Sequence, residues 1–156
     1  MKAYLTLRNA VAATVAIGVA AASASMAAAE TLISEVPFQR HLNLTCFPDG
    51  SGCNGNIGPV AAKQRLVIQF VSCTGDGAAN STLRNFSASV HDTTKLLGKH
   101  YIAPTYRSPE EPYIYLASQP ILLTVSEGNI LVLSSVSIGG TFNVACGVSG
   151  VRQRFQ

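Results

Sequence analysis

The 156-residue chain has no tryptophan, and it is poor in aromatic residues (7%) and in charged residues (12%). Soluble domains carry about 25% charged residues, so the charged share is about half the usual one. Disordered segments combine high charge with low hydrophobicity, whereas 47% of this chain is hydrophobic. The composition therefore excludes a disordered chain and an acidic or basic tail, and the length allows one domain and hardly two.

Basic side chains are too few for a nucleic-acid partner. The whole chain has 11 Lys and Arg against 8 Asp and Glu, a formal net charge of +3. Two of the basic residues, Lys2 and Arg8, lie in a segment that we expect to be removed, which leaves a net charge of +1. Because the remaining charges are scattered, the mature chain has no electrostatic footprint for nucleic acid.

Residues 1–29 have the composition of a secretory signal peptide. Lys2 and Arg8 give a positive start, residues 10–22 form an uncharged apolar run, and the alanines at 27–29 are small residues of the kind that a signal peptidase reads. We expect cleavage after Ala29. The alternative is a membrane anchor, because about 20 uncharged residues can span a bilayer. The run is only weakly apolar, however, and no basic residue follows it closely.

Cleavage leaves residues 30–156 as a single mature domain, long enough for a real hydrophobic core. This predicts a periplasmic or extracellular protein with no transmembrane segment in its mature form. The alanine-rich style of the segment resembles that of bacterial export signals.

All four cysteines lie in the mature part, and an even number of cysteines in an exported chain indicates disulfide bonds. Three pairings are possible, and we favour Cys46–Cys53 with Cys73–Cys146. The segment between Cys46 and Cys53 is rich in turn-forming residues and closes a short loop at little entropic cost. Cys73 and Cys146 each end an apolar, strand-like run, so their bridge would tie the first half of the chain to the last strands.

The alternation before Cys73 conflicts with this second bridge. Leu66, Ile68 and Phe70 are the more apolar alternate positions of the strand, whereas Cys73 falls in the other set. Either a β-bulge shifts the register or the bridge lies on the less buried face. The cysteines show no C-x-x-C spacing, so neither a metal site nor a cofactor is predicted.

Apolar residues of the mature chain recur at every second position, which is the period of strands and not of helices. About eight to ten short strands, with no helix to cover a parallel sheet, predict two antiparallel sheets packed face to face. The expected fold is an all-β antiparallel β-sandwich, jelly-roll or Ig-like, and a small β-barrel is the alternative. The strands are expected at residues 32–36, 38–46, 65–73, 83–91, 95–102, 113–117, 120–126, 129–138, 141–148 and 151–155.

Glycine-containing segments mark the expected turns. Residues 127–129 and 139–140 separate apolar runs as hairpin turns, and residues 74–77, Thr-Gly-Asp-Gly, end the strand before them. Two long loops are expected, at residues 47–64 and 103–112.

Candidate catalytic residues form no recognisable constellation. His91 and Asp92 are adjacent, but successive residues of a strand point to opposite faces, so they cannot orient each other directly. No G-x-S-x-G nucleophile turn occurs. Glu110 and Glu111 are consecutive in a proline-bounded loop, poorly placed to flank one sugar bond, and the chain lacks the tryptophan on which such enzymes commonly bind a ring. We therefore expect no enzyme, and a hydrolase is the least favoured function.

A tyrosine-rich stretch between residues 100 and 115 is the best candidate for a binding surface, because it contains all four tyrosines of the mature chain. Tyrosine and arginine on a proline-stiffened loop can contact a partner at low entropic cost. We expect the loop at 102–112 to bind an unknown protein or glycan, and the alternative is that the last two tyrosines belong to a strand and cap the core. The predicted binding residues are Tyr101, Tyr106, Arg107, Tyr113 and Tyr115.

Three segments of the mature chain carry a resemblance to known sequences. They are residues 60–72 (VAAKQRLVIQFVS), 118–125 (SQPILLTV) and 144–150 (VACGVSG). All three are similar to segments that recur in small exported bacterial proteins of uncharacterised function. The resemblance implies a secreted β-sandwich and no particular activity. The expected function is accordingly that of an exported non-catalytic binding or interaction domain, acting as a monomer.

A second comparison is with chaperone-assembled pilus subunits, which are exported, disulfide-bonded β-sandwiches of similar size. Phe155 is a penultimate aromatic residue, as in such subunits. Against this, Gly147 and Gly150 interrupt the last strand, and residues 30–36 lack the alternation of a donor strand. A subunit of a surface assembly such as a pilus-like fibre is therefore the alternative function.

Overall fold

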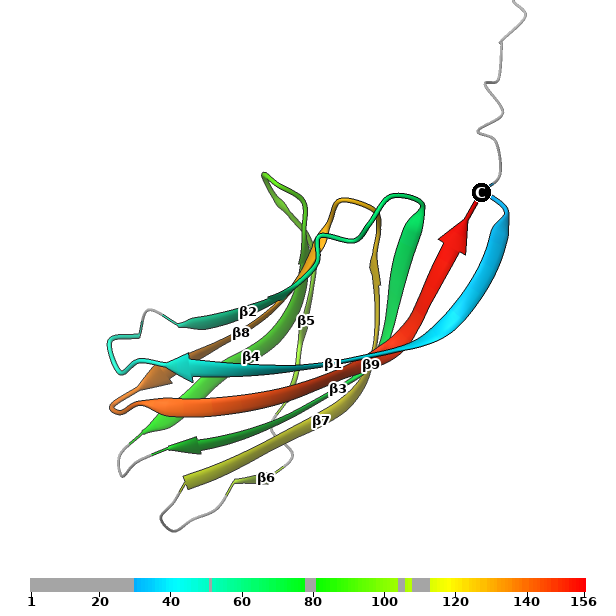
Figure 1. Cartoon of the computed structure of the whole chain (residues 1–156). Coiled ribbons are helices and arrows are strands. Elements are labelled where there is room, and N and C mark those ends of the chain that lie inside the picture. The colour runs from blue at the N-terminus through cyan, green and yellow to red at the C-terminus, as the bar shows by residue number, and fades with distance from the viewer. Residues whose placement is uncertain (1–29, 51, 78–80, 104–105, 108–112) are drawn as a thin grey trace, which may run out of the picture.

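The computed structural model describes residues 30–50, 52–77, 81–103, 106–107 and 113–156. In this part of the chain there are nine strands and no helix, and the strands form two antiparallel sheets that do not close into a barrel (Figure 1). The predicted β-sandwich is confirmed, and the barrel alternative is wrong. None of the described residues belongs to a helix that is long and apolar enough to cross a membrane.

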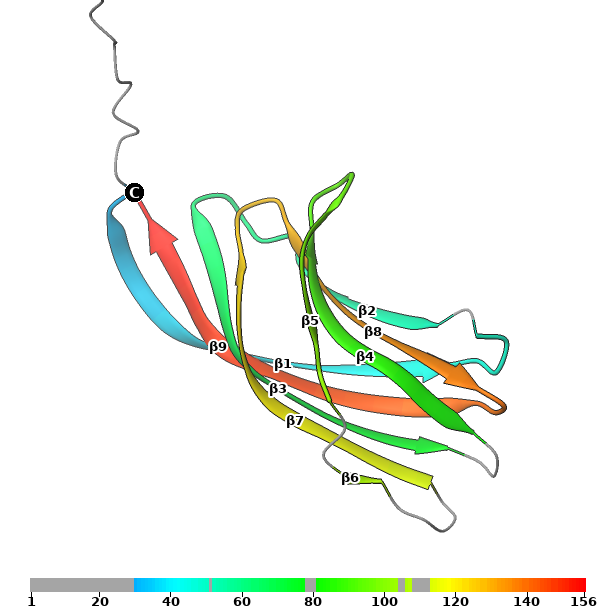
Figure 2. The same ribbon diagram turned by 180° about the vertical axis from the view of Figure 1, so that it is seen from behind.

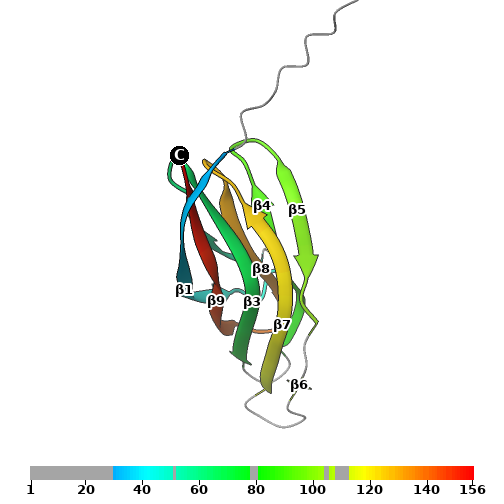
Figure 3. The ribbon, with the colours of Figure 1, turned by 90° about the vertical axis from the view of Figure 1, so that its right-hand side faces the viewer.

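Sheet A is the larger layer, and its long strands run side by side and curve together (Figure 1). Figure 2 shows the same curvature from behind, and Figure 3 shows β9, β3 and β7 next to one another. Its strands follow the order β1 (Leu32–Cys46), β9 (Phe142–Phe155), β3 (Gln64–Gly77), β7 (Tyr113–Val125) and β6 (Tyr106–Arg107). Sheet B has the order β2 (Cys53–Ile57), β8 (Ile130–Ile138), β4 (Thr82–His91) and β5 (Leu96–Tyr101).

Alternate side chains of the two central strands fill the space between the sheets. On β8, Leu131 and Leu133 are fully buried and their neighbours are only partly buried. On β9 the same alternation buries Phe142, Val144 and every second residue up to Val148. In β9 the buried positions are the apolar set of the two-residue period, whereas β8 has apolar residues on both faces and its buried set continues through Ser135 and Ser137.

Three pairs of predicted strands are single strands in the structure. Residues 32–36 and 38–46 form β1, residues 113–117 and 120–126 form β7, and residues 141–148 and 151–155 form β9. The expected strands left gaps at residue 37, at 118–119 and at 149–150, but Pro37 lies on the edge strand β1 and Pro120 lies where no described strand covers β7. Because an edge strand uses only one side of its main chain for pairing, proline does not interrupt it there.

Two strands lie inside predicted loops. β2 occupies part of the expected loop at 47–64, and β6 occupies part of the expected loop at 103–112. Residues 74–77 were expected to end a strand, yet they continue β3 to Gly77. Gly75 and Gly77 fit within the sheet because the ring of Phe142 packs against both, in the space that a Cβ atom would occupy.

The two predicted hairpin turns connect different sheets. Gly128 and Gly139 have positive φ angles of 75° and 87°, so tight glycine turns are present where the sequence indicates them. However, β7 and β9 belong to sheet A and β8 belongs to sheet B. The strands on either side of each turn are therefore not hydrogen-bonded to each other, and the prediction of hairpins is wrong.

Both predicted disulfide bonds are present. Cys46–Cys53 joins the end of β1 to the start of β2 and so links the two sheets. Cys73–Cys146 joins directly opposed residues of the neighbouring strands β3 and β9. All four cysteines are buried, so both bridges are part of the core.

A β-bulge at Gln69 resolves the conflict over the faces of β3. The register of β3 against β9 shifts between Ile68 and Phe70, so Gln69 is one extra residue. Ile68 is buried before the bulge, and the buried alternation resumes at Val71 after it. Cys73 consequently faces the core, while Phe70, which belonged to the expected buried set, is 38% exposed on the outer face.

We expect the two disulfide bonds to contribute unequally to stability. The bridges close loops with sequence separations of 73 and 7 residues. In the chain-entropy model, replacing Cys73 and Cys146 by alanine should lower the free energy of unfolding by about 4 kcal/mol, and replacing Cys46 and Cys53 by about 2.5 kcal/mol. Urea unfolding of the two double variants measures both values. A larger loss from the shorter bridge would contradict the prediction.

Candidate functional site

The outer face of sheet A, which points away from sheet B, carries a line of small side chains along its inner strand β9. The outward residues of this strand are Asn143, Ala145, Gly147 and Ser149. Opposite them stand Gln39, His41, Asn43 and Thr45 of β1 and Phe70, Ser72, Thr74 and Asp76 of β3. The register thus places each of Ala145, Gly147 and Ser149 between two larger side chains, and Asn143, which is no smaller than its neighbours, ends the line.

A groove follows from this arrangement. Its main hollow has a volume of about 400 Å³ and lies over Gly147, between His41 and Ser72. A second hollow of about 270 Å³ continues toward Asp76, and it shares Asn43 and Ala145 with the first. We call the two together the β9 groove. Ligand pockets typically measure about 300–1,000 Å³, so the groove is large enough for a small ligand or part of a chain.

The groove is lined mainly by uncharged side chains, which present more apolar than polar surface together with several amide and hydroxyl groups. A side-chain nitrogen of Gln39 lies 3.5 Å from Nε2 of His41, at the limit of hydrogen-bond distance. Hydroxyl and amide side chains line most of the remaining length. Within the described part of the chain, no lysine or arginine lines either hollow, and Asp76 at one end is the one carboxylate.

Gly147, on the floor of the groove, is a glycine that the fold itself does not require. A Cβ atom at this position would lie 3.6 Å from the His41 ring, an ordinary van der Waals contact, and the backbone does not have a positive φ. At each of the other described glycines, a local feature of the structure accounts for the choice of glycine. Gly50, Gly52, Gly58, Gly128 and Gly139 have positive φ; Gly55, Gly75, Gly77, Gly140 and Gly150 are crowded; Gly98 adjoins a bulge in β5.

Glycine inside a strand lowers stability by about 0.5–1 kcal/mol relative to alanine. At Gly147 neither packing nor backbone conformation offsets this cost. Glycine in a strand often marks a place where a ligand approaches the backbone closely. We therefore take the β9 groove, with Gly147 at its centre, as the candidate binding site.

The residues predicted to bind are dispersed over the molecule. Tyr101 is on β5 of sheet B, where its ring is 63% exposed and stacks under the Lys99 ammonium group at 4.8 Å. Tyr115 is 5% exposed, and its ring packs edge-on against Phe142 in the core. Its position agrees with the alternative of a tyrosine that caps the core, and it offers no surface to a partner.

The remaining predicted binding residues lie at the far edge of sheet A. Tyr106 and Arg107 form β6, paired with Leu116 and Tyr115 of β7, and Tyr113 begins β7. Their side chains, together with residues 104–105 and 108–112 of the predicted loop, which include Glu110 and Glu111, lie outside the described residues. Their role in binding stays a prediction.

Histidines and carboxylates do not meet in the part of the chain that the structure describes. His41, His91 and His100 have as side-chain partners Gln39, Ser89 and Gln119, in that order. Asp92 instead accepts hydrogen bonds from the backbone N–H groups of Thr94 and Lys95, and these bonds lower the pKa of its carboxyl group. Asp92 therefore stabilises the turn between β4 and β5, and it does not orient His91.

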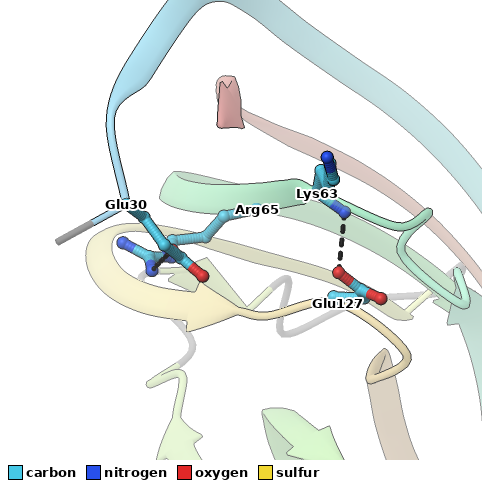
Figure 4. A network of polar contacts seen from close by, with 4 residues as sticks. All are labelled: Glu30, Lys63, Arg65 and Glu127. Carbon is cyan, nitrogen blue, oxygen red and sulfur yellow. Dashed lines mark hydrogen bonds and ion pairs between the residues drawn. The ribbon is translucent and has the colours of Figure 1, made fainter. Parts of the chain in front are cut away.

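A small charged hollow at one end of the sandwich is structural. Its volume is about 120 Å³, and the charged groups around it contact one another (Figure 4). Arg65 pairs with Glu30 at 3.2 Å and stacks on Phe155, and the backbone N–H of Lys63 donates to the Glu127 carboxylate at 2.7 Å. These contacts hold the start of β1, the end of β9 and the two turns together.

Comparisons of the chain with protein-family models, with curated proteins and with solved structures give no match. Nor does the described part of the chain contain a group of three or more residues that could hold a metal ion. The site is therefore interpreted from its own geometry alone.

Reasoning from the sequence missed the β9 groove. Its polar residues are common in exposed strands, and nothing in their spacing brings β1, β3 and β9 together. One signal was available: Gly147 and Gly150 interrupt an otherwise regular alternation. Only the structure separates the two, because a Cβ atom at Gly150 would overlap the carbonyl oxygen of Val67, whereas one at Gly147 would not.

We expect the two glycines of β9 to respond oppositely to alanine. Gly147→Ala should raise the free energy of unfolding by about 0.5–1 kcal/mol, because it removes backbone freedom from the unfolded chain without steric cost. Gly150→Ala should lower it by about 1–3 kcal/mol, because the backbone of β3 must shift. Urea unfolding of both variants measures the two changes in the free energy of unfolding. A destabilised Gly147→Ala would show that the fold requires this glycine.

Proposed function

We propose that the protein is exported, loses residues 1–29 and acts as a non-catalytic binding domain whose ligand occupies the β9 groove. The observation that carries the proposal is Gly147, a strand glycine at the floor of a hollow of about 400 Å³ that neither packing nor backbone conformation explains. A binding function explains it, because any larger side chain there would project into the groove.

The disulfide bonds support export. Two disulfides persist in oxidising compartments such as the periplasm or the medium, and are rare in the reducing cytoplasm. The proposed cleavage after Ala29 places the new N-terminus at Glu30, whose carboxylate contacts Arg65. The mature chain would then begin at a residue that the sandwich already holds.

The sheet edges support a monomer over a fibre subunit. An open edge strand invites pairing with another chain, and proteins protect such edges with proline, charge or short strands. Pro37 lies in β1 and Pro120 in the uncovered part of β7, while sheet B ends in the five-residue β2 and in β5 with the exposed Lys99. Each of these strands carries one of the protective features, which favours the binding domain over the pilus-like alternative.

A hydrolase receives less support. General acid–base catalysis by histidine requires a group that orients the ring, most often a carboxylate. The three histidines contact glutamine and serine side chains instead, and Ser89, the partner of His91, is 3% exposed. A buried serine beside a histidine is closed to substrate.

Export and cleavage can be checked on the protein made by its own cells. We expect the intact mass of the protein from the periplasm or the medium to correspond to a chain that begins at Glu30 with both disulfides formed. Replacing Ala29 by phenylalanine should keep residues 1–29 attached and leave the protein in the membrane fraction. A wild-type protein that retains residues 1–29 would contradict the proposal.

Binding in the groove can be tested before the ligand is known. The mature protein is immobilised and exposed to the solubilised envelope and medium of the producing cells. We expect at least one component to be retained by the wild type and lost with Gly147→Val, whose methyl groups fill the floor of the groove.

Gly98→Val is the matched control, because a Cβ atom there meets no neighbour within 4 Å and Gly98 lies on β5, away from the groove. It should retain the same component as the wild type. If every retained component is unaffected by Gly147→Val, the groove is not the binding site.

A further inference from the structure

We infer that the ligand of the β9 groove is an extended, uncharged glycan. This inference rests on the proposed binding function and adds the chemical class of the ligand. It follows from four features of the groove. These are its direction along the sheet, its lack of charge, the hydrogen bonding of its floor strand to both neighbouring strands, and the side chains that line its walls.

The groove is elongated and follows the strand direction. It runs along β9 from Ser149 to Asn143, with side chains of β1 on one wall and of β3 on the other. At about 3.4 Å per residue, this length is about 20 Å. A groove of that length fits several units of a linear chain better than one compact molecule.

The lining carries almost no charge. Neither a lysine nor an arginine lines the groove within the described residues, and its one carboxylate, Asp76, stands at the end. Clefts that select charged ligands are lined by charges of the opposite sign, which raise the local ligand concentration. The groove therefore favours a neutral ligand over a phosphorylated or uronic one.

The strand β9 forms the floor of the groove, and its backbone N–H and C=O groups are already paired with neighbouring strands. It therefore cannot pair with a peptide strand. β9 pairs with β1 on one side and with β3 on the other along its length. Peptides recognised in extended form bind by adding a strand to an open sheet edge, where main-chain groups are unpaired. A peptide lying over β9 would leave its own N–H and C=O groups to be satisfied by side chains alone, which makes it the weaker candidate.

The walls match the surface of a sugar chain. Gln39, Asn43, Ser72 and Thr74 are amides and hydroxyls, which can both donate hydrogen bonds to hydroxyl groups and accept them. At one end Phe70, 38% exposed, presents an aromatic face in a chain that has no tryptophan. A glycan combines hydroxyl edges with apolar C–H faces, so it satisfies both kinds of wall at once.

The inference is tested by calorimetric titration of the mature protein with defined probes. These are linear neutral glucans and N-acetylglucosamine oligomers, the neutral oligosaccharides released from the producer's own envelope, and oligogalacturonate as the charged counterpart. We expect saturable binding of at least one neutral probe and weaker binding of oligogalacturonate. Gly147→Val should lower the affinity at least about tenfold, because its methyl groups clash with the bound chain.

Two matched pairs of variants show whether a loss of affinity arises in the groove: Gly147→Val with Gly98→Val, and Phe70→Ala with Leu122→Ala. Gly98→Val should bind like the wild type, as should Leu122→Ala, which removes an exposed apolar side chain of β7 that does not line the groove. Phe70→Ala should weaken binding through loss of the ring. Urea unfolding confirms that each variant folds, and a folded Phe70→Ala with unchanged affinity would overturn the assignment of the aromatic wall.

The outcomes separate this inference from the proposed function. If no neutral oligosaccharide binds while the wild type still retains a protein that Gly147→Val loses, the glycan inference fails and the binding function stands. If oligogalacturonate binds more tightly than every neutral probe, the inference of an uncharged ligand fails. If neither a glycan nor a retained component depends on Gly147, both proposals fail together.

Discussion

The single extra residue at Gln69 is the constraint on which both faces of sheet A depend. With regular alternation, Phe70 would point into the core and Cys73 would point outward, away from the buried Cys146. The bulge leaves Gln69 and Phe70 both exposed, and the inward positions resume at Val71. The same irregularity thus places a sulfur atom in the core and an aromatic ring beside the groove.

The disulfide between β3 and β9 then preserves the register that forms the groove. Cys73 lies directly opposite Cys146, and in the next row Ser72 lies opposite Gly147. A slip of one residue between these strands would reverse the faces of their side chains. The covalent bond on the inner face therefore fixes the β3 wall against the floor of the groove on the outer face.

The pattern of the strands also shows how much could be predicted from the sequence alone. The two-residue period of β9 agrees with its buried face, and the turn glycines Gly128 and Gly139 were placed correctly, because both signals are local. The expected gaps at Pro37 and before Pro120 are absent, since the effect of a proline depends on whether a neighbouring strand covers that side of its strand. The pairing of the cysteines was predicted, but the face of Cys73 was left open, because a bulge has no residue type that reveals it.

By itself, the sequence indicated the fold class, the favoured disulfide pairing and the low charge of residues 30–156. The fold class and the charge depend on composition and on a period of two residues, and the favoured pairing depends on the turn-rich segment between Cys46 and Cys53. The candidate site was decided only by the tertiary structure. Its walls come from residues near positions 40 and 70 and its floor from residues near position 145, and the sheet order β1-β9-β3 that brings them together is set by long-range pairing. In the sequence, Gly147 cannot be distinguished from any other strand glycine. What distinguishes it is the groove above it, which forms only when β1 and β3 lie on either side of β9.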